Sequence, residues 1–162
     1  MITEFSKIDT NNFDAVAQIY KAGIQTGNAT FETNIPSFEE WDQKHLPFGR
    51  IVILKDETLV GWAALSKVSD RCVYEGVAEV SVYVSVRGEG LGTQLLQKLI
   101  EISESEGLWT LQCGIMRENI ASIRLHEKCG FRKIGYREKV GKLNGIWRDN
   151  ILMERRSKTV GI

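Results

Sequence analysis

VSVRGEGLGTQLL, residues 84–96, joins a valine-rich segment to a leucine-rich segment through three glycines at alternate positions. The valines before it alternate with polar residues, which predicts a strand. After it, apolar residues recur every three or four positions from Leu91 to Ile102, which predicts an amphipathic helix that starts near Gly90 and stops at Gly107. The stretch is therefore expected to be a strand-to-helix junction of an α/β domain.

The glycines of this junction predict an anion-binding turn. The first turn of a helix presents free N–H groups and the positive end of a dipole. Glycines at positions 88, 90 and 92 remove side chains that would block these groups, and Arg87 adds a cation. The GxxxxGK[ST] loop is absent, and Thr93 stands where GxGxxG requires glycine. A plain tight turn is the alternative, but three glycines and an arginine exceed what it requires.

Strand and helix patterns alternate along the rest of the chain and predict a single domain. Strands are expected at Ile2–Ile8, Ile51–Leu54, Leu59–Leu65, Val73–Val86, Thr110–Ile115, Arg132–Lys142 and Ile146–Glu154. Helices are expected at Asn12–Gln25, Ser37–His45, Leu91–Glu106 and Ile120–Cys129. This order predicts an α/β (α+β) domain over residues 1–156, with a central mixed sheet flanked by helices and a loose tail at 157–162.

The composition argues against several classes of function. The chain has 162 residues, with 21 acidic and 21 basic residues, so no net charge draws it to nucleic acid or to a membrane. No apolar run has transmembrane length, and Met1–Phe5 is typical of a strand rather than a signal peptide. Three widely spaced cysteines and two histidines suggest neither a disulfide framework nor a metal site, which favours reduced thiols in the cytoplasm.

Several longer segments carry a resemblance to a known family. They are ATFET (29–33), GWAALS (61–66), AEVSVYV (78–84), NIASIRLHEKCGF (119–131) and VGKLNGIWRD (140–149), together with the Arg-x-x-Gly-x-Gly motif at 87–92. In this order they resemble the GCN5-related N-acetyltransferase (GNAT) family, in its phosphinothricin and methionine sulfoximine acetyltransferase branch.

The resemblance implies the GNAT acyl-CoA N-acyltransferase fold, acetyl-CoA as cosubstrate, no metal and a homodimer. It also implies acetyl transfer to the amine of a small amino-acid-like substrate, such as phosphinothricin or methionine sulfoximine or sulfone. Two alternatives stay open: acetylation of a protein N-terminus or lysine, and a module that binds acetyl-CoA without turnover.

The resemblance also indicates which residues hold the cosubstrate. In this sequence they are Val82, Tyr83, Val84, Arg87, Gly88, Gly90, Leu91, Gly92, Thr93, Gln94, Leu95, Asn119 and Ser122. The N–H of Tyr83 or Val84 is the candidate donor to the thioester carbonyl. Asn119 takes the place of an asparagine that binds the pantetheine arm. Alternatively, Asn119 is only a helix N-cap and Ser122 only a solvated helix residue.

Two residues are candidates for proton transfer. An amine in water is mostly ammonium, so a base or a water relay must remove a proton before it attacks. Glu79 lies on the polar face of the expected strand and at the family's base position; a solvated carboxylate is the alternative. His126 shares a helical face with Asn119 and Ser122, and it occupies the place of a proton-donating tyrosine in other branches. It is expected to act as an acid or in a proton relay, or else to be structural.

The acceptor end is the part where the chain departs from the branch. Candidate substrate-binding residues are Phe31, Glu32, Arg71, Tyr74, Glu75 and Glu79. Arg71 suits a substrate carboxylate or phosphinate as a bidentate partner. Glu75, however, replaces an arginine of the branch, which predicts a lower preference for doubly anionic acceptors.

Overall fold

The computed structural model describes residues 2–162 as a mixed sheet with helices on both faces. Its helices are α1 (Phe13–Gln25), α2 (Phe38–Lys44), α3 (Leu91–Ser105) and α4 (Ile120–Lys128), with a short 3-10 helix, η1 (Cys72–Tyr74). Its strands are β1 (Thr3–Lys7), β2 (Ile51–Lys55), β3 (Thr58–Lys67), β4 (Val77–Val84), β5 (Thr110–Met116), β6 (Arg132–Leu143) and β7 (Ile146–Arg156).

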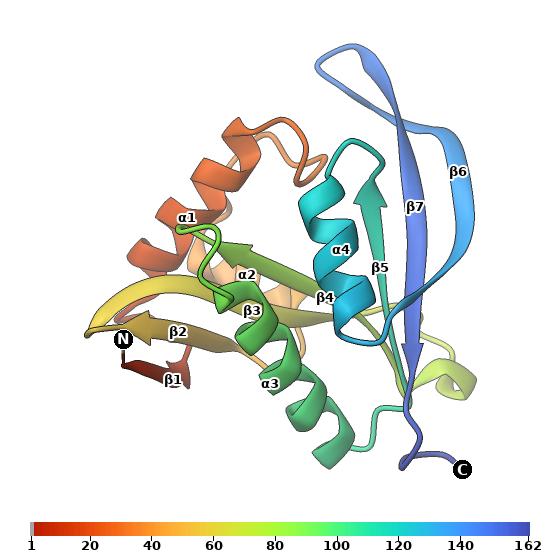
Figure 1. Ribbon diagram of the computed structural model, residues 1–162, viewed down its shortest axis with the longest axis horizontal. Helices are drawn as coiled ribbons and strands as arrows, with labels where there is room; N and C mark the ends of the chain where they lie inside the picture. Colours follow the sequence, from red (N-terminus) through yellow and green to blue (C-terminus); the bar gives the residue numbers. More distant parts are fainter. Residues whose placement is uncertain (1) are drawn as a thin grey trace.

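The seven strands lie in the order β1-β2-β3-β4-β5-β7-β6, and only β4 and β5 are parallel. Figure 1 shows α3 and α4 in front of the sheet, α2 behind it, and the β6–β7 hairpin extending beyond the rest of the fold. The predicted mixed sheet flanked by helices is therefore confirmed.

Two apolar clusters, one on each face, hold the layers together. The larger cluster joins the leucines of α3 to Ile53, Leu65 and Val80 of the sheet. The smaller joins α1 and Trp41 of α2 to the opposite face, at Trp62 and at other residues of β2 and β3. Because β2 and β3 are buried on both faces, their sequences are almost continuously apolar.

The predicted strand at Val73–Val86 is wrong at both ends. The 3-10 helix η1 precedes the strand, and a turn begins after Val84. Gly76 explains the first boundary: a Cβ there would lie 2.1 Å from the Trp109 ring, and the Gly76 carbonyl accepts a hydrogen bond from the Trp109 N–H at 2.8 Å. The chain therefore reaches β4 from a turn packed directly against Trp109.

The segment expected to be a loose tail is held against the domain. The Ser157 hydroxyl donates to Glu104 Oε1 at 2.9 Å, and its N–H donates to the Trp109 carbonyl at 2.8 Å. The Arg156 guanidinium donates to the carbonyl of Val160 at 2.8 Å. Ser157 is buried by these contacts, which composition alone does not reveal.

Candidate active site

A large open cavity lies where β4 and β5 separate. Their parallel pairing covers only residues 77–79 of β4 and 110–112 of β5. Beyond it lies a cavity of about 1370 Å³, lined by β4, the glycine turn, the start of α4, the loop after α1, and the β6–β7 hairpin. It brings together many of the predicted residues: Phe31, Glu32, Glu79, Val82, Tyr83, Val84, Arg87, Gly88, Gly90, Leu91, Gly92, Thr93, Asn119, Ser122 and His126.

The glycine turn forms one end of this cavity. Gly88 and Gly90 have φ of +79° and +73°, and a Cβ on either would have no heavy atom within 4 Å. The turn therefore needs glycine for its left-handed backbone, and it also leaves open space beside the start of α3. The Glu89 carboxylate, which would repel an anion, is paired with Lys55 Nζ at 2.6 Å.

The N-terminus of α3 has no side-chain cap. Its N-cap is Gly90, and the first hydrogen bond of the helix runs from the Gln94 N–H to the Gly90 carbonyl at 3.1 Å. The preceding amides, at residues 91–93, have no partner within the helix, as the first turn requires. A pyrophosphate is an anion that such a turn fits, because the amides and the helix dipole both favour negative charge.

Further amide donors face the gap between β4 and β5. The Ser85 N–H donates to the Val60 carbonyl at 2.8 Å, on the β3 side. Amide directions alternate along an extended strand, so the N–H groups of Val82 and Val84 point away from β3, toward the gap. Of the two predicted donors to a thioester carbonyl, this geometry favours Val84 over Tyr83, which pairs with Trp62 of β3.

Glu79 lies at the point where the two strands separate. Its side chain is exposed, but it lines the cavity, and the surrounding protein raises the pKa of the carboxyl above its ordinary value of 4.5. A hydrogen bond from the Gln112 side chain acts in the opposite direction on this pKa. The carboxylate is thus a stronger base than one in free solvent.

His126 is buried in α4, with 4% of its surface exposed. Its Nδ1 lies 2.7 Å from the Ser122 carbonyl oxygen, so Nδ1 carries the proton and donates. Burial lowers the pKa of the imidazole, although this hydrogen bond acts in the opposite direction. The neutral ring therefore has Nε2 as a proton acceptor, which suits a relay better than direct proton donation.

Asn119 has two structural contacts in addition to its place in the cavity. Its Oδ1 accepts a hydrogen bond from the Ser122 N–H at 3.3 Å, which caps α4. Its Nδ2 donates to the Asn28 carbonyl at 3.2 Å, in the loop after α1. The N-cap interpretation of Asn119 is confirmed, and it is compatible with a second role because the amide retains one N–H and one lone pair.

The loop after α1 forms a wall of the cavity at the end away from the glycine turn. A Cβ on Gly141 of β6 would lie 3.1 Å from the Phe31 ring, so Phe31 packs directly over the hairpin. Burial raises the pKa of the Tyr20 and Tyr83 phenols, and this effect outweighs that of the Thr30 side chain, which acts to lower both pKa values. Both phenols therefore stay neutral and can donate hydrogen bonds near neutral pH.

Five residues that the sequence predicted for the site do not line the cavity. Arg71, Tyr74 and Glu75 are exposed around η1, where the Arg71 guanidinium lies 5.5 Å from the centre of the Tyr74 ring. Gln94 and Leu95 lie in the next part of α3: the Gln94 Oε1 accepts from the Thr3 hydroxyl at 3.0 Å, and Leu95 is fully buried in the core.

Sequence reasoning missed other residues that line the cavity: Tyr20, His45, Gln112, Arg137 and Asn150. Gln112 had a usable signal, because it is the polar residue between two apolar ones in a predicted strand that runs next to Glu79. Arg137 and Asn150 lie opposite each other on β6 and β7. The sequence predicts a hairpin turn at Leu143–Gly145 but not that β7 pairs with β5, so it gave no signal that these two residues reach the site.

Within residues 2–162, no three His, Cys, Asp or Glu side chains come together as a metal site, and no helix is long and apolar enough to cross a membrane.

Comparisons with known proteins agree on one family. The model of the "Acetyltransferase (GNAT) family" matches residues 14–131. A phosphinothricin N-acetyltransferase of Alcaligenes faecalis is 32% identical over 156 residues, which is 90% of this chain and 78% of that protein. An L-methionine sulfoximine/L-methionine sulfone acetyltransferase of Pseudomonas aeruginosa is 43% identical over 83 residues, covering 50% of this chain and 48% of the relative.

A solved structure gives the same result. The crystal structure of a GNAT superfamily phosphinothricin acetyltransferase from Sinorhizobium meliloti, in complex with AcCoA, superposes with a TM-score of 0.89. The alignment covers 99% of this chain and 91% of that chain, at 26% identity.

Proposed function

The chain belongs to the acetyltransferase (GNAT) family, and from that premise we propose that its cavity transfers an acetyl group from acetyl-CoA to the amine of a small amino acid. The family and the fold predicted from the sequence are both confirmed. Phosphinothricin and methionine sulfoximine or sulfone are the proposed acceptors, since they are named for the relatives. The observation that carries the proposal is one cavity with an uncapped helix N-terminus at one end and Glu79 inside it.

Acetyl-CoA fits the residues at the glycine end. The space beside Gly88 and Gly90 admits a pyrophosphate to the free amides of residues 91–93, with Arg87 as a further cation on the lining. We propose that the gap between β4 and β5 receives the pantetheine arm and thioester, close to Asn119 and Ser122. Bound acetyl-CoA supplies a thioester as the acetyl donor.

Glu79 is the proposed base. It accepts a proton from the acceptor ammonium, directly or through a water molecule, so that a neutral amine can attack. The raised pKa supports this role, because a carboxylate with a pKa nearer to neutrality holds the proton better. The hydrogen bond from Gln112 keeps the carboxylate oriented and ionised.

The N–H of Val84 is the proposed donor to the carbonyl oxygen as negative charge develops on it. His126, with Nδ1–H committed to the Ser122 carbonyl, offers Nε2 as an acceptor and is proposed to act in a proton relay. Tyr20 and Tyr83 stay neutral and supply O–H groups at the acceptor end.

The test is a panel of amines incubated with acetyl-CoA, with thiol release and the mass of the product as readouts. We expect acetylation of phosphinothricin, methionine sulfoximine or methionine sulfone, and none of unrelated peptides. Exclusive acetylation of peptide N-termini or lysines would overturn the small-molecule proposal. Acetyl-CoA binding without turnover of any amine would point to a binding module.

A homodimer and a cytoplasmic location are also proposed. Close to Arg71, the side chains of Val73 and Tyr74 are 61% and 45% exposed. Large hydrophobic side chains exposed at η1 support a protein contact there. The three free cysteines support a reducing compartment. Sedimentation of the wild type and of Val73→Glu tests the dimer: we expect a dimer that the variant weakens, and a wild-type monomer would contradict it.

A further inference from the structure

The loop of residues 26–33, here called the acceptor loop, is a cavity wall with little backbone support. It connects α1 to the segment before α2 and contains no helix or strand. Its N–H groups at Thr26 and Gly27 bond back to the end of α1. Across the part of the chain that the structure describes, no backbone–backbone hydrogen bond reaches residues 28–33. Side chains from other elements therefore decide where this wall lies.

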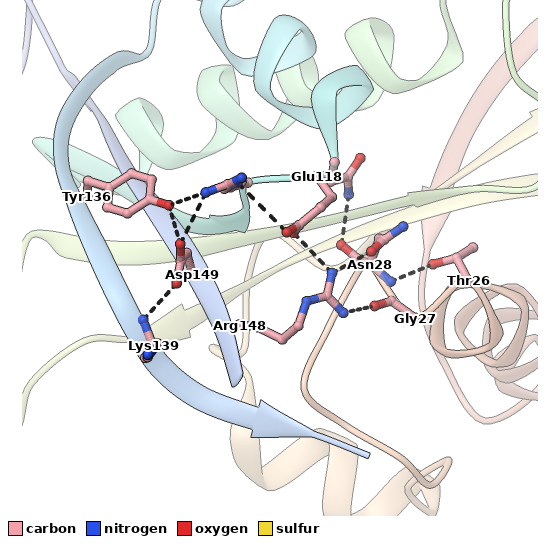
Figure 2. A network of polar contacts seen from close by, with 10 residues as sticks. Thr26, Gly27, Asn28, Glu118, Tyr136, Lys139, Arg148 and Asp149 are labelled. Atoms are coloured by element: carbon pink, nitrogen blue, oxygen red, sulfur yellow. Dashed lines mark hydrogen bonds and ion pairs between the residues drawn. The ribbon is translucent and has the colours of Figure 1, made fainter. Parts of the chain in front are cut away.

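Arg148 of β7 holds the start of the acceptor loop, as Figure 2 shows. Its Nη1 donates to the Gly27 carbonyl at 2.6 Å, and its Nη2 donates to Asn28 Oδ1 at 2.5 Å. The same Nη2 lies 3.1 Å from Glu118 Oε2, in the turn before α4. One guanidinium thus joins three segments: the hairpin, the acceptor loop and the turn that leads to Asn119.

The environment of Arg148 makes these contacts strong. Its side chain is only 14% exposed, so the hydrogen bonds are largely shielded from water. Its hydrogen bond is the main cause of the lowered pKa of Glu118. Asn28 receives a second contact, since its carbonyl accepts from Asn119 Nδ2 at 3.2 Å. Arg148 and Asn119 therefore fix both the side chain and the backbone of Asn28.

We propose that Arg148 is a positioning residue that sets the acceptor loop over the acceptor end of the cavity. The identity of the substrate rests on the proposed function, whereas the contacts of Arg148 with the acceptor loop do not depend on it. Three residues beyond Asn28, Phe31 packs on Gly141, and the neighbouring Thr30 lines the cavity together with Tyr20 and Tyr83. Displacing Gly27 and Asn28 would move these groups, which line the acceptor end.

Only an arginine suits this position. Its planar guanidinium offers five N–H donors in a fixed arrangement, whereas lysine carries a compact ammonium with three. Arg148→Lys keeps the charge next to Glu118 but cannot span Gly27, Asn28 and Glu118 together. We therefore expect kcat/KM for the acceptor to fall by about 10-fold to 100-fold, the scale of a misplacement of about 1 Å. The change should lie mainly in the acceptor KM, with the acetyl-CoA Kd little altered.

Arg117→Lys is the matched control. Arg117 also lies beside Glu118, its Nε 4.0 Å from Oε1, but within residues 2–162 it hydrogen-bonds no residue of the acceptor loop and does not line the cavity. Its Nη1 lies 3.1 Å from the Tyr136 hydroxyl. Both variants replace a guanidinium by an ammonium near the same hairpin. Kinetics in both substrates and thermal unfolding should be measured for each variant. Amide hydrogen exchange without ligand should be measured at the loop amides that donate hydrogen bonds, those of Thr26, Gly27, Asn28 and Glu32.

The expected result is faster exchange of these four hydrogen-bonded amides and a raised acceptor KM in Arg148→Lys alone. Equal exchange in Arg148→Lys and wild type would overturn the inference even if no acceptor had been found. Faster exchange with an unchanged acceptor KM would show that the loop does not position the acceptor. Failure of the wild type to acetylate any amine would count against the proposed function and leave the exchange result to decide the role of Arg148.

Discussion

Glu79 and Gln112 are the last register pair between the parallel strands β4 and β5. Beyond this pair the strands no longer pair, and the cavity opens. The candidate base thus lies at the apex of the gap, beside the polar side chain that hydrogen-bonds it. Partial desolvation of the carboxyl by the surrounding protein raises the pKa of Glu79, and Gln112 limits the rise, so the two residues together set the pH range of the base.

Replacing the base should slow the chemical step and leave cosubstrate binding intact. We expect Glu79→Gln to reduce kcat by about 10²–10⁴, the usual effect of losing a general base. Calorimetry should give an acetyl-CoA Kd close to that of the wild type. Glu154→Gln is the control, because Glu154 pairs with Gln112 in the sheet but does not line the cavity. Wild-type turnover in Glu79→Gln would show that Glu79 is only a carboxylate on the strand face.

Removing the hydrogen bond from Gln112 should change the pH dependence in a defined direction. Gln112→Met keeps the length of the side chain but cannot donate to the carboxylate, so the pKa of Glu79 should rise further. Activity that needs ionised Glu79 is lost as the pH falls through this pKa. The acidic limb of the kcat/KM profile should therefore move to higher pH. A shift to lower pH, or none, would contradict the pairing of the two residues.

The glycine turn can be tested with two glycines of the same helix. Gly90 and Gly107 flank α3, have φ of +73° and +84°, and would each place a Cβ in open space. Alanine at either site carries a similar backbone strain, of about 1–2 kcal/mol. Only Gly90→Ala should also weaken acetyl-CoA binding, because only Gly90 lines the cavity. Equal acetyl-CoA affinities in the two variants, at similar stability, would argue against a phosphate site at this turn.

The sequence predicted the elements well because their signals are local. The leucine repeat defined α3, and the valine alternation placed Glu79 on the polar face of β4. Contacts between segments far apart in the sequence left no such signal. The Gln94 side chain meets Thr3, and Asn119 meets Asn28, each 91 residues away in the sequence. The resemblance assigned a role to Gln94 and to Asn119 separately. The structure shows that each side chain already has a hydrogen-bond partner within the protein.

Protonation of His126 should lower the stability of the fold in acid. Burial lowers the pKa of this imidazole below 6.5. Between the lowered value and 6.5 the unfolded chain binds more protons than the folded one, so the stabilisation is complete above pH 6.5 and is lost as the pH falls. Urea unfolding at about pH 7.5 and about pH 5.5 should show a smaller difference in His126→Gln than in wild type. His45, whose pKa is also lowered, should retain part of the dependence.

Among residues 2–162, the part of the β6–β7 hairpin that lines the cavity contains one arginine, Arg137, and it has no side-chain partner. Arg132 of β6 is paired with Glu154 at 2.7 Å, and Arg148 of β7 is committed to Glu118 and the acceptor loop. Arg137 lines the cavity opposite Asn150, and within residues 2–162 its guanidinium makes no ion pair or hydrogen bond to another side chain. It is therefore free to meet an anionic group of the acceptor. Glu75, which the sequence suggested as a determinant of selectivity, is exposed and does not line the cavity.

Acceptor selectivity should therefore follow Arg137 rather than Glu75. Two unit charges about 4 Å apart interact by about 4 kcal/mol at an effective dielectric of about 20, and each 1.4 kcal/mol is about tenfold in specificity. In wild type, replacing the acceptor carboxylate by a carboxamide should lower kcat/KM by about tenfold or more, and Arg137→Gln should remove most of this difference. Glu75→Arg should leave the ratio between phosphinothricin and methionine sulfone unchanged, because its charge meets solvent. The opposite result would be a kcat/KM ratio that shifts toward phosphinothricin in Glu75→Arg, with no effect of Arg137→Gln. It would show that the segment around η1, and not Arg137, determines acceptor selectivity.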